Sequence, residues 1–173
     1  MATLHRHARE ATVVVLALAV PLLLLTSAPP LVVPARVHDV VLRSHLAALA
    51  LGFGAVLAVD WHGLLWLLRR IELGELLTVT TRLTTPIWLG LAGLVTTGAL
   101  LDPDTGSTLT RLKIALVALV AVNGLHASAV HRALSARRGS AVPRRLLVRA
   151  LAVGGLSQLG WWGATVIGLL NSR

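Results

Sequence analysis

Long apolar stretches fill almost the whole chain, and short polar loops separate them. A bilayer core about 30 Å thick needs roughly 20 consecutive apolar residues for each helical span. We therefore expect an all-α fold, an integral membrane bundle of five transmembrane helices in a single transmembrane domain over residues 1–173. The predicted spans cover residues 11–34, 41–68, 77–101, 109–134 and 145–170.

The first apolar stretch has a second interpretation. A basic start, an apolar run over residues 12–26 and a Ser-Ala-Pro-Pro sequence at 27–30 also resemble a secretory signal peptide. Because the apolar run continues to Val33, we favour a retained helix. If the segment were cleaved, a protein of four helices would remain.

Composition narrows the class of protein. With 55% hydrophobic and 13% charged residues, the chain is too apolar for a soluble domain of this length. The absence of cysteine excludes disulfides, iron–sulfur clusters, thiolate metal sites and cysteine nucleophiles. Redox chemistry would therefore need a cofactor held by other ligands. The bias toward Ala, Leu, Val and Arg indicates a GC-rich bacterial genome, so we expect a multi-pass protein of the bacterial cytoplasmic (inner) membrane.

The formal net charge of +9 raises the question of a nucleic-acid partner. The arginines gather in loops, and no aromatic residues interleave with them to form a base-stacking surface, so we expect no nucleic acid. Basic loops of membrane proteins face the cytoplasm. Here they precede the first span and follow the second and fourth, whereas the loop after the third contains Asp102 and Asp104. This alternation predicts an amino terminus inside the cell and a carboxyl terminus outside.

Ionisable residues within the predicted spans are costly in lipid, so each is a candidate for function. The predicted topology arranges the polar residues in two layers. The outer layer contains His45 and Lys113, which could instead simply lie at the headgroup boundary, where a lysine side chain can extend toward water. The inner layer contains Asp60, His62, Arg82, Asn123, His126 and Arg149. At about 1.5 Å rise per residue, the layers are roughly 20–25 Å apart along the second span, so one compact site cannot use both.

The inner layer supports a specific hypothesis about a cofactor. His62 and His126 lie at similar depths on different spans, and two neutral imidazoles are suitable axial ligands for the iron of a haem b. Met1 is the only methionine, so histidine is the expected ligand type. Arg82 or Arg149 would pair with a haem propionate.

Two other interpretations of the inner layer stay open. Asp60 could pair with Arg82 or His126 in a structural cluster, with the histidines in hydrogen bonds between helices. The same residues could instead form a proton or ion pathway.

Glycines at short helical spacing predict close contacts between helices, because small residues let helix backbones approach in a membrane. The pairs are Gly90 and Gly93, Gly154 and Gly155, and Gly160 and Gly163. Gly63, Gly124 and the glycines of the fifth span would also leave room for a flat macrocycle.

About half the chain, from His45 to His131, resembles two groups of small bacterial membrane proteins. These are the copper-resistance protein D family and the HemJ-type protoporphyrinogen oxidases. The matching features are His45-Leu46-Ala47-Ala48 with Gly52 and Gly54, Arg82-Leu83-Thr84-Thr85-Pro86 before Thr97-Gly98, and Leu112-Lys113 before Asn123 and His126. The Thr85-Pro86 pair in particular is similar to the HemJ type, whereas the Met-rich or His-rich pattern of a copper handler is missing.

The HemJ resemblance implies a bound haem b and a functional role for histidine and lysine, at the positions of His45 and Lys113. It therefore favours the outer layer as the site, whereas depth alone favours the inner pair His62 and His126.

The leading functional hypothesis is a small haem-b-binding redox protein, an oxidoreductase if it is an enzyme, that acts in electron transfer or porphyrin oxidation. The first alternative is a non-enzymatic accessory or assembly subunit, with partner subunits of a membrane complex or further copies of itself. The second is a proton-coupled transporter that uses Asp60, His126 and Arg82. All three place the chain in a lipid bilayer.

Overall fold

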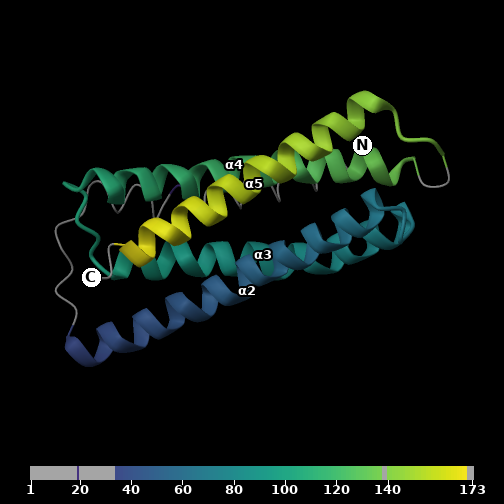
Figure 1. Ribbon diagram of the computed structural model, residues 1–173. Coiled ribbons are helices and arrows are strands. Elements are labelled where there is room, and N and C mark those ends of the chain that lie inside the picture. Colours follow the sequence, from purple (N-terminus) through teal and green to yellow (C-terminus); the bar gives the residue numbers. More distant parts are fainter. Residues whose placement is uncertain (1–18, 20–33, 138–139, 171–173) are drawn as a thin grey trace, which may run out of the picture.

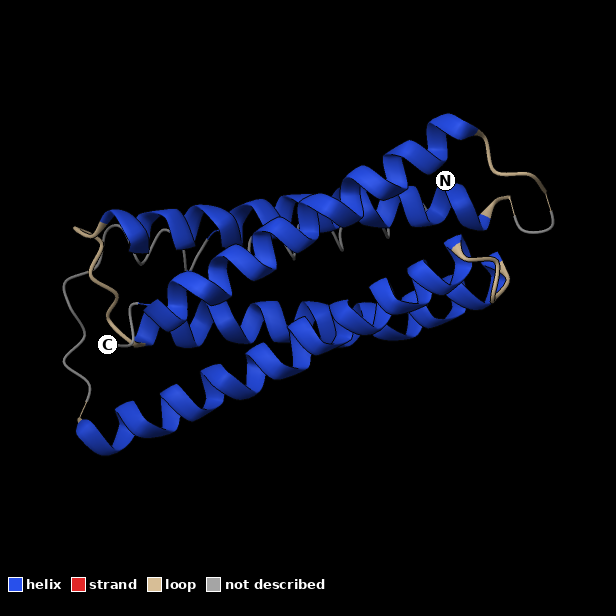
Figure 2. Ribbon diagram, viewed as in Figure 1, coloured by secondary structure: helices blue, strands red, loops and turns tan. Residues whose placement is uncertain are grey.

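The computed structural model describes residues 19, 34–137 and 140–170 of the chain. Long α-helices make up most of this part, and short loops join them (Figures 1 and 2). The helices are α2 (Ala35–Leu67), α3 (Leu73–Leu100), α4 (Thr108–Ser135) and α5 (Arg144–Leu170). The predicted first span, residues 11–34, lies almost entirely outside the described residues.

The start of α2 departs most from the sequence prediction, since the helix begins six residues before the predicted span at 41. The carbonyl of Pro34 accepts hydrogen bonds from the backbone nitrogens of Val37 and His38, at 2.9 and 3.0 Å, and so begins the helix there. With 33 residues, α2 is about 50 Å long, which exceeds the thickness of a bilayer core. Polar residues such as Arg36 and Asp39 occupy its exposed first turns.

The four helices form two antiparallel hairpins, α2 with α3 and α4 with α5, and fewer contacts join α3 to α4 (Figure 1). As a result, the α2–α3 and α4–α5 loops lie at the same end of the bundle. The α3–α4 turn and the first turns of α2 lie at the opposite end.

The core of the bundle joins the two hairpins. Phe53 of α2 stacks on Trp161 of α5, with ring centroids 5.7 Å apart and an interplanar angle of 4°. All four helices contribute buried residues to this cluster, which contains Phe53, Val56, Leu91, Val120, Ala121 and Trp161. The core therefore fixes the position of one hairpin on the other.

Glycines mark the closest helix contacts within each hairpin. A Cβ atom on Gly52 of α2 would lie 3.1 Å from the Cα of Gly90 on α3, and one on Gly93 would lie 2.8 Å from the Cβ of Ala48. In the other hairpin, a Cβ on Gly163 would lie 2.8 Å from the side chain of Leu116. Gly160 likewise faces Val120.

These contacts confirm the prediction of close packing for Gly90, Gly93, Gly160 and Gly163. Gly154 and Gly155 have no neighbouring atom within 4 Å of an added Cβ, so the prediction is wrong for them.

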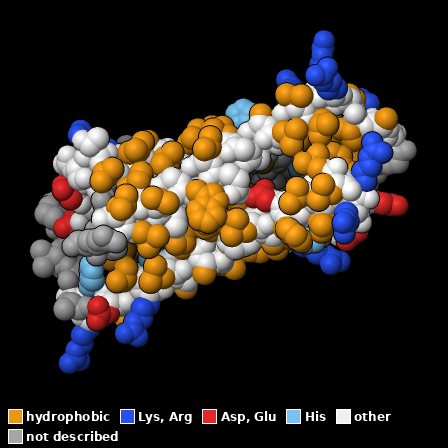
Figure 3. Space-filling model, in the orientation of Figure 1, with side chains coloured by type: hydrophobic (Ala, Val, Ile, Leu, Met, Phe, Trp, Pro, Cys, Tyr) orange, Lys and Arg blue, Asp and Glu red, His pale blue; other side chains and the backbone are white. Residues whose placement is uncertain are grey.

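The surface of the bundle is that of a membrane protein. Large apolar side chains are exposed along the helices, and charged side chains gather mainly toward the two ends (Figure 3). Among the described residues, three helices are long and apolar enough to cross a bilayer, namely Arg36–Leu67, Leu73–Leu100 and Thr108–Ser135. Helix α5 has a similar length but carries Arg149 and Gln158 and is not among them.

Candidate functional site

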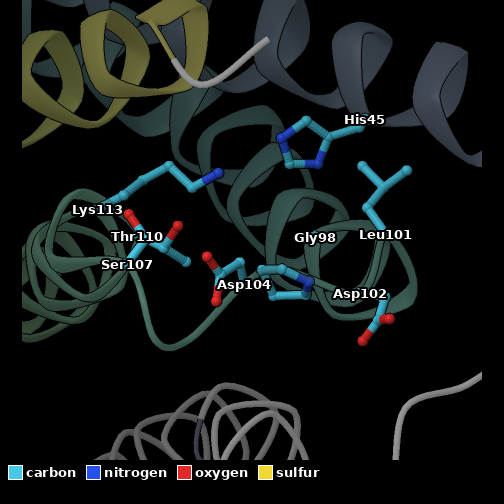
Figure 4. Close-up of a pocket in the computed structure, with 9 residues that line it drawn as sticks. His45, Gly98, Leu101, Asp102, Asp104, Ser107, Thr110 and Lys113 are labelled. Atoms are coloured by element: carbon cyan, nitrogen blue, oxygen red, sulfur yellow. The ribbon is translucent and has the colours of Figure 1, made fainter. Parts of the chain in front are cut away.

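A pocket of about 400 Å³ lies at the end of the bundle that contains the α3–α4 turn (Figure 4). Helix α2 contributes one wall, the end of α3 and the turn contribute another, and the start of α4 contributes the third. The lining residues are His45, Gly98, Leu101, Asp102, Pro103, Asp104, Ser107, Thr110 and Lys113.

His45 is the aromatic group of this pocket, and a neighbouring helix holds its ring. Its Nδ1 lies 2.8 Å from the hydroxyl oxygen of Thr97 on α3. That oxygen is in turn 2.6 Å from the carbonyl oxygen of Gly93, one helical turn earlier. The ring rests beside Gly98, where an added Cβ would lie 3.5 Å from the Cε1 atom of His45. The imidazole is therefore half-buried at the junction of α2 and α3.

Lys113 approaches the same pocket from the other hairpin. It lies one turn after Thr110, which is 5% exposed, near the start of α4. The half-buried lysine side chain extends toward the His45 ring (Figure 4). The structure thus brings His45 and Lys113, which are far apart in sequence, into one cavity.

The α3–α4 turn adds acidic groups to the wall of the pocket. Asp102 has a positive φ of 47°, a conformation that Asp tolerates better than most residues. The Oδ1 atom of Asp104 accepts a hydrogen bond of 2.9 Å from the backbone nitrogen of Gly106. Sequence reasoning used Asp102 and Asp104 only for the topology, and it identified neither Thr97 as a partner of His45 nor Thr110 as part of the pocket.

In the inner layer, Asp60 has a partner that sequence reasoning did not choose. The side-chain amide nitrogen of Gln158 on α5 donates a hydrogen bond to Oδ2 of Asp60 on α2. The sequence hypothesis paired Asp60 with Arg82 or His126. Both of those side chains are instead exposed, on α3 and α4 respectively.

Asn123 joins the two helices of its own hairpin. The side chain is 5% exposed, and its amide nitrogen donates a 2.9 Å hydrogen bond to the backbone carbonyl of Val153 on α5. This contact accounts for a polar residue inside the α4–α5 interface.

The two histidines of the inner layer make hydrogen bonds within their own helices. The Nδ1 of His62 contacts the Ala58 carbonyl at 2.7 Å, and that of His126 contacts the Val122 carbonyl at 3.2 Å. Each bond stays within one helix, and Arg149 is exposed on α5. Within the described part of the chain, no group of three or more His, Cys, Asp or Glu residues is arranged to hold a metal ion.

One of the glycines expected to leave room for a macrocycle, Gly124, does not do so. The indole of Trp88 fills the space beside Gly124, since an added Cβ there would lie 2.9 Å from its ring. Gly63, by contrast, has no neighbour within 4 Å of such an atom.

Comparisons with protein-family models, curated proteins and solved structures find no match to this chain. The resemblance to the copper-resistance protein D and HemJ groups therefore stays a prediction.

Proposed function

We propose that this chain is a multi-pass membrane protein that binds one haem b at the His45–Lys113 pocket and acts in redox chemistry. The observation that carries the proposal is the position of the His45 imidazole, which Thr97 holds against the wall of a cavity that also contains a lysine. Histidine ligands of metals characteristically use one ring nitrogen for an orienting hydrogen bond and the other for the metal.

Two side chains of the pocket, His45 and Lys113, are suited to hold a haem. His45 would hold the haem iron, as histidine does in many haem proteins, and no cysteine is needed. Lys113 would pair with a propionate carboxylate through a charge-assisted hydrogen bond. Leu101 and Gly98 contribute apolar surface to the lining of the pocket. When bound, haem supplies one-electron transfer, with a potential that depends on the axial ligand and its surroundings.

The outer pocket is a better candidate than the inner pair His62 and His126. The Nδ1 atoms of both inner histidines contact backbone carbonyls of their own helices. His126 is exposed on α4. His45 and Lys113, by contrast, line one cavity.

We further propose five spans in the bacterial inner membrane, with the amino terminus inside and the carboxyl terminus outside. Exposed arginines at the end of the bundle with the α2–α3 and α4–α5 loops support this orientation, because basic loops face the cytoplasm. These arginines are Arg69, Arg70, Arg132, Arg137, Arg144 and Arg145. At the opposite end, the negative charges of Asp39, Asp102 and Asp104 offset the positive charges of the basic residues. In this orientation, the pocket lies toward the outer face of the membrane.

The test is an absorption spectrum of the protein, purified in mild detergent after expression with added haem precursor, first oxidised and then reduced with dithionite. We expect a strong Soret band and sharp bands in the reduced state. His45→Ala should abolish these bands, whereas His62→Ala and His126→Ala should retain them. Only tryptophan absorbance in the wild type would refute haem binding. Loss of the bands in His62→Ala and His126→Ala but not in His45→Ala would move the site to the inner layer.

A second candidate function is an accessory subunit of a larger membrane complex. Arg82 on α3 and His126 on α4 are both exposed, although each lies within a helix long and apolar enough to span a membrane. Polar side chains on a lipid-facing surface are costly and favour contact with another protein. Native mass spectrometry from mild detergent should reveal a stoichiometric partner that Arg82→Leu releases. A monomer in which Arg82→Leu changes nothing would exclude this role.

A further inference from the structure

We infer that Thr97 is a positioning residue: it fixes the proton of His45 on Nδ1 and leaves Nε2 as an electron-pair donor facing the pocket. The inference deepens the proposed function, because it specifies which histidine atom meets the ligand. Its physical basis is independent of haem, since it follows from the hydrogen bonds of the protein alone.

The single proton of the Thr97 hydroxyl fixes the direction of its hydrogen bonds to Gly93 and to His45. A hydroxyl group has one proton to donate, whereas a backbone carbonyl can only accept. The Thr97 oxygen lies 2.6 Å from the Gly93 carbonyl oxygen, so the hydroxyl proton lies between these two atoms. Toward His45 Nδ1, at 2.8 Å, the same oxygen can therefore only accept. The Nδ1 atom must carry the proton.

The opposite arrangement is unfavourable. If Thr97 donated its proton to His45, its oxygen and that of Gly93 would face each other at 2.6 Å with no proton between them. Two acceptors at that distance repel, and the carbonyl would lose a hydrogen bond inside the bundle. The geometry therefore selects one of the two neutral tautomers.

The second ring nitrogen, Nε2, then carries a free electron pair. His45 lines the cavity, and its ring points toward the Lys113 side chain (Figure 4). A lysine ammonium offers only donors, so it is compatible with a lone pair on Nε2 and incompatible with an N–H there. Thr97 on α3 and Lys113 on α4 thus favour the same tautomer from opposite sides of the ring.

This assignment defines the chemical class of ligand. A group that binds Nε2 must accept an electron pair, as a metal centre does, or must offer an O–H or N–H donor. A group that binds Lys113 must be an acceptor, such as a carboxylate. A metal chelate with carboxylate substituents satisfies both requirements, in agreement with the proposed haem.

Nitrogen-15 NMR of histidine-labelled, haem-free protein tests the inference, because the protonated and unprotonated ring nitrogens have well-separated shifts. The His45 signals are assigned by their loss in His45→Gln. We expect a single tautomer with the proton on Nδ1 in the wild type and in Thr97→Ser. Thr97→Val, which keeps the shape but removes the hydroxyl, should give a mixture of tautomers.

Thr96→Val is the matched control, since Thr96 is the exposed neighbour in the same helix. It should leave the His45 signals unchanged. A wild-type spectrum with the proton on Nε2 would overturn the inference, even if Thr97→Val did not fold. An unchanged tautomer in folded Thr97→Val would overturn it as well.

A haem titration separates the two proposals. Thr97→Val should weaken haem binding about 10–100-fold, as is typical for the loss of a group that orients a metal ligand, and Thr97→Ser should restore it. Absence of haem binding together with the expected tautomer would refute the proposed function alone. Haem binding with the other tautomer would refute the inference alone.

Discussion

The contacts that a polar side chain makes with neighbouring helices indicate its role more clearly than its depth in the membrane does. His45 and Asn123 both lie inside helices, but His45 reaches a cavity and Asn123 a backbone carbonyl. Asn123 is thereby occupied in packing, whereas His45 keeps a nitrogen for a ligand. By position in the sequence, both residues were intramembrane polar groups, and only the family resemblance singled out His45.

The role of Asn123 leads to a prediction about stability. Asn123→Leu removes the hydrogen bond to Val153 and should destabilise the α4–α5 hairpin by about 0.6 kcal/mol, the average for hydrogen bonds between helices in a membrane, and by at most about 1.7 kcal/mol. Unfolding in mixed detergent micelles measures the change, with the exposed Val122→Ala as control. Haem binding should persist in Asn123→Leu under stabilising conditions. Its selective loss from a fully folded variant would place Asn123 in the site instead.

At the scale of the element, each hairpin depends on a glycine contact, and the two hairpins meet through aromatic rings and through polar contacts such as Asp60–Gln158 and Thr81–His131. The Gly52–Gly90 contact brings α2 close to α3, and Phe53 next to it stacks on Trp161 of α5. The position of His45 on α2 relative to Thr97 on α3 therefore depends on this helix crossing.

Substitution of Gly90 tests the importance of the crossing. In Gly90→Ala the new methyl group would lie 2.8 Å from the carbonyl oxygen of Ala48 and would also meet the backbone of Gly52. Backbone atoms cannot yield as a side chain does, so we expect a loss of stability of about 1–3 kcal/mol. Gly54→Ala, where an added Cβ has no neighbour within 4 Å, is the control and should be close to neutral. Equal effects in the two variants would contradict the packing described for α2 and α3.

The Asp60–Gln158 bond joins the hairpins and can be measured with a double-mutant cycle. Asp60→Leu and Gln158→Leu should each destabilise the bundle, and their combination should cost less than the sum. We expect a coupling of roughly 0.6 kcal/mol, up to about 1.7 kcal/mol. Asp60→Asn keeps an acceptor oxygen and should retain most of the stability. Additive effects of the two leucine substitutions would mean that the bond does not form.

At the scale of the whole molecule, the helices could be predicted from sequence and the site only in part. Apolar stretches of sufficient length predicted the four described helices to within a few residues, apart from the start of α2. The same stretches are apolar on nearly all sides, so the pattern does not reveal which face of a helix meets the bundle. For that reason the equal depths of His62 and His126 did not predict contact, and the partnership of Thr97 with His45 could not be foreseen.

The proposed orientation can be tested with single cysteines, because the chain has none of its own. Thr105→Cys lies in the exposed α3–α4 turn and Ser140→Cys in the exposed basic loop. A membrane-impermeant thiol reagent should label the cysteine at position 105 in intact cells and the one at 140 only after permeabilisation. The reverse pattern would invert the proposed topology and place the pocket on the cytoplasmic side.

The measurement that tests the central claim most directly compares haem with haem dimethyl ester, which lacks free carboxylates, as ligands of the purified protein. Wild type should bind haem more tightly than the ester, at one molecule per chain. Lys113→Met should lose this preference and bind both ligands with similar affinity. The control Arg111→Met, at an exposed neighbouring position, should keep the preference for haem. Equal affinities for haem and its ester in the wild type, or a preference unchanged in Lys113→Met, would contradict a shared His45–Lys113 site.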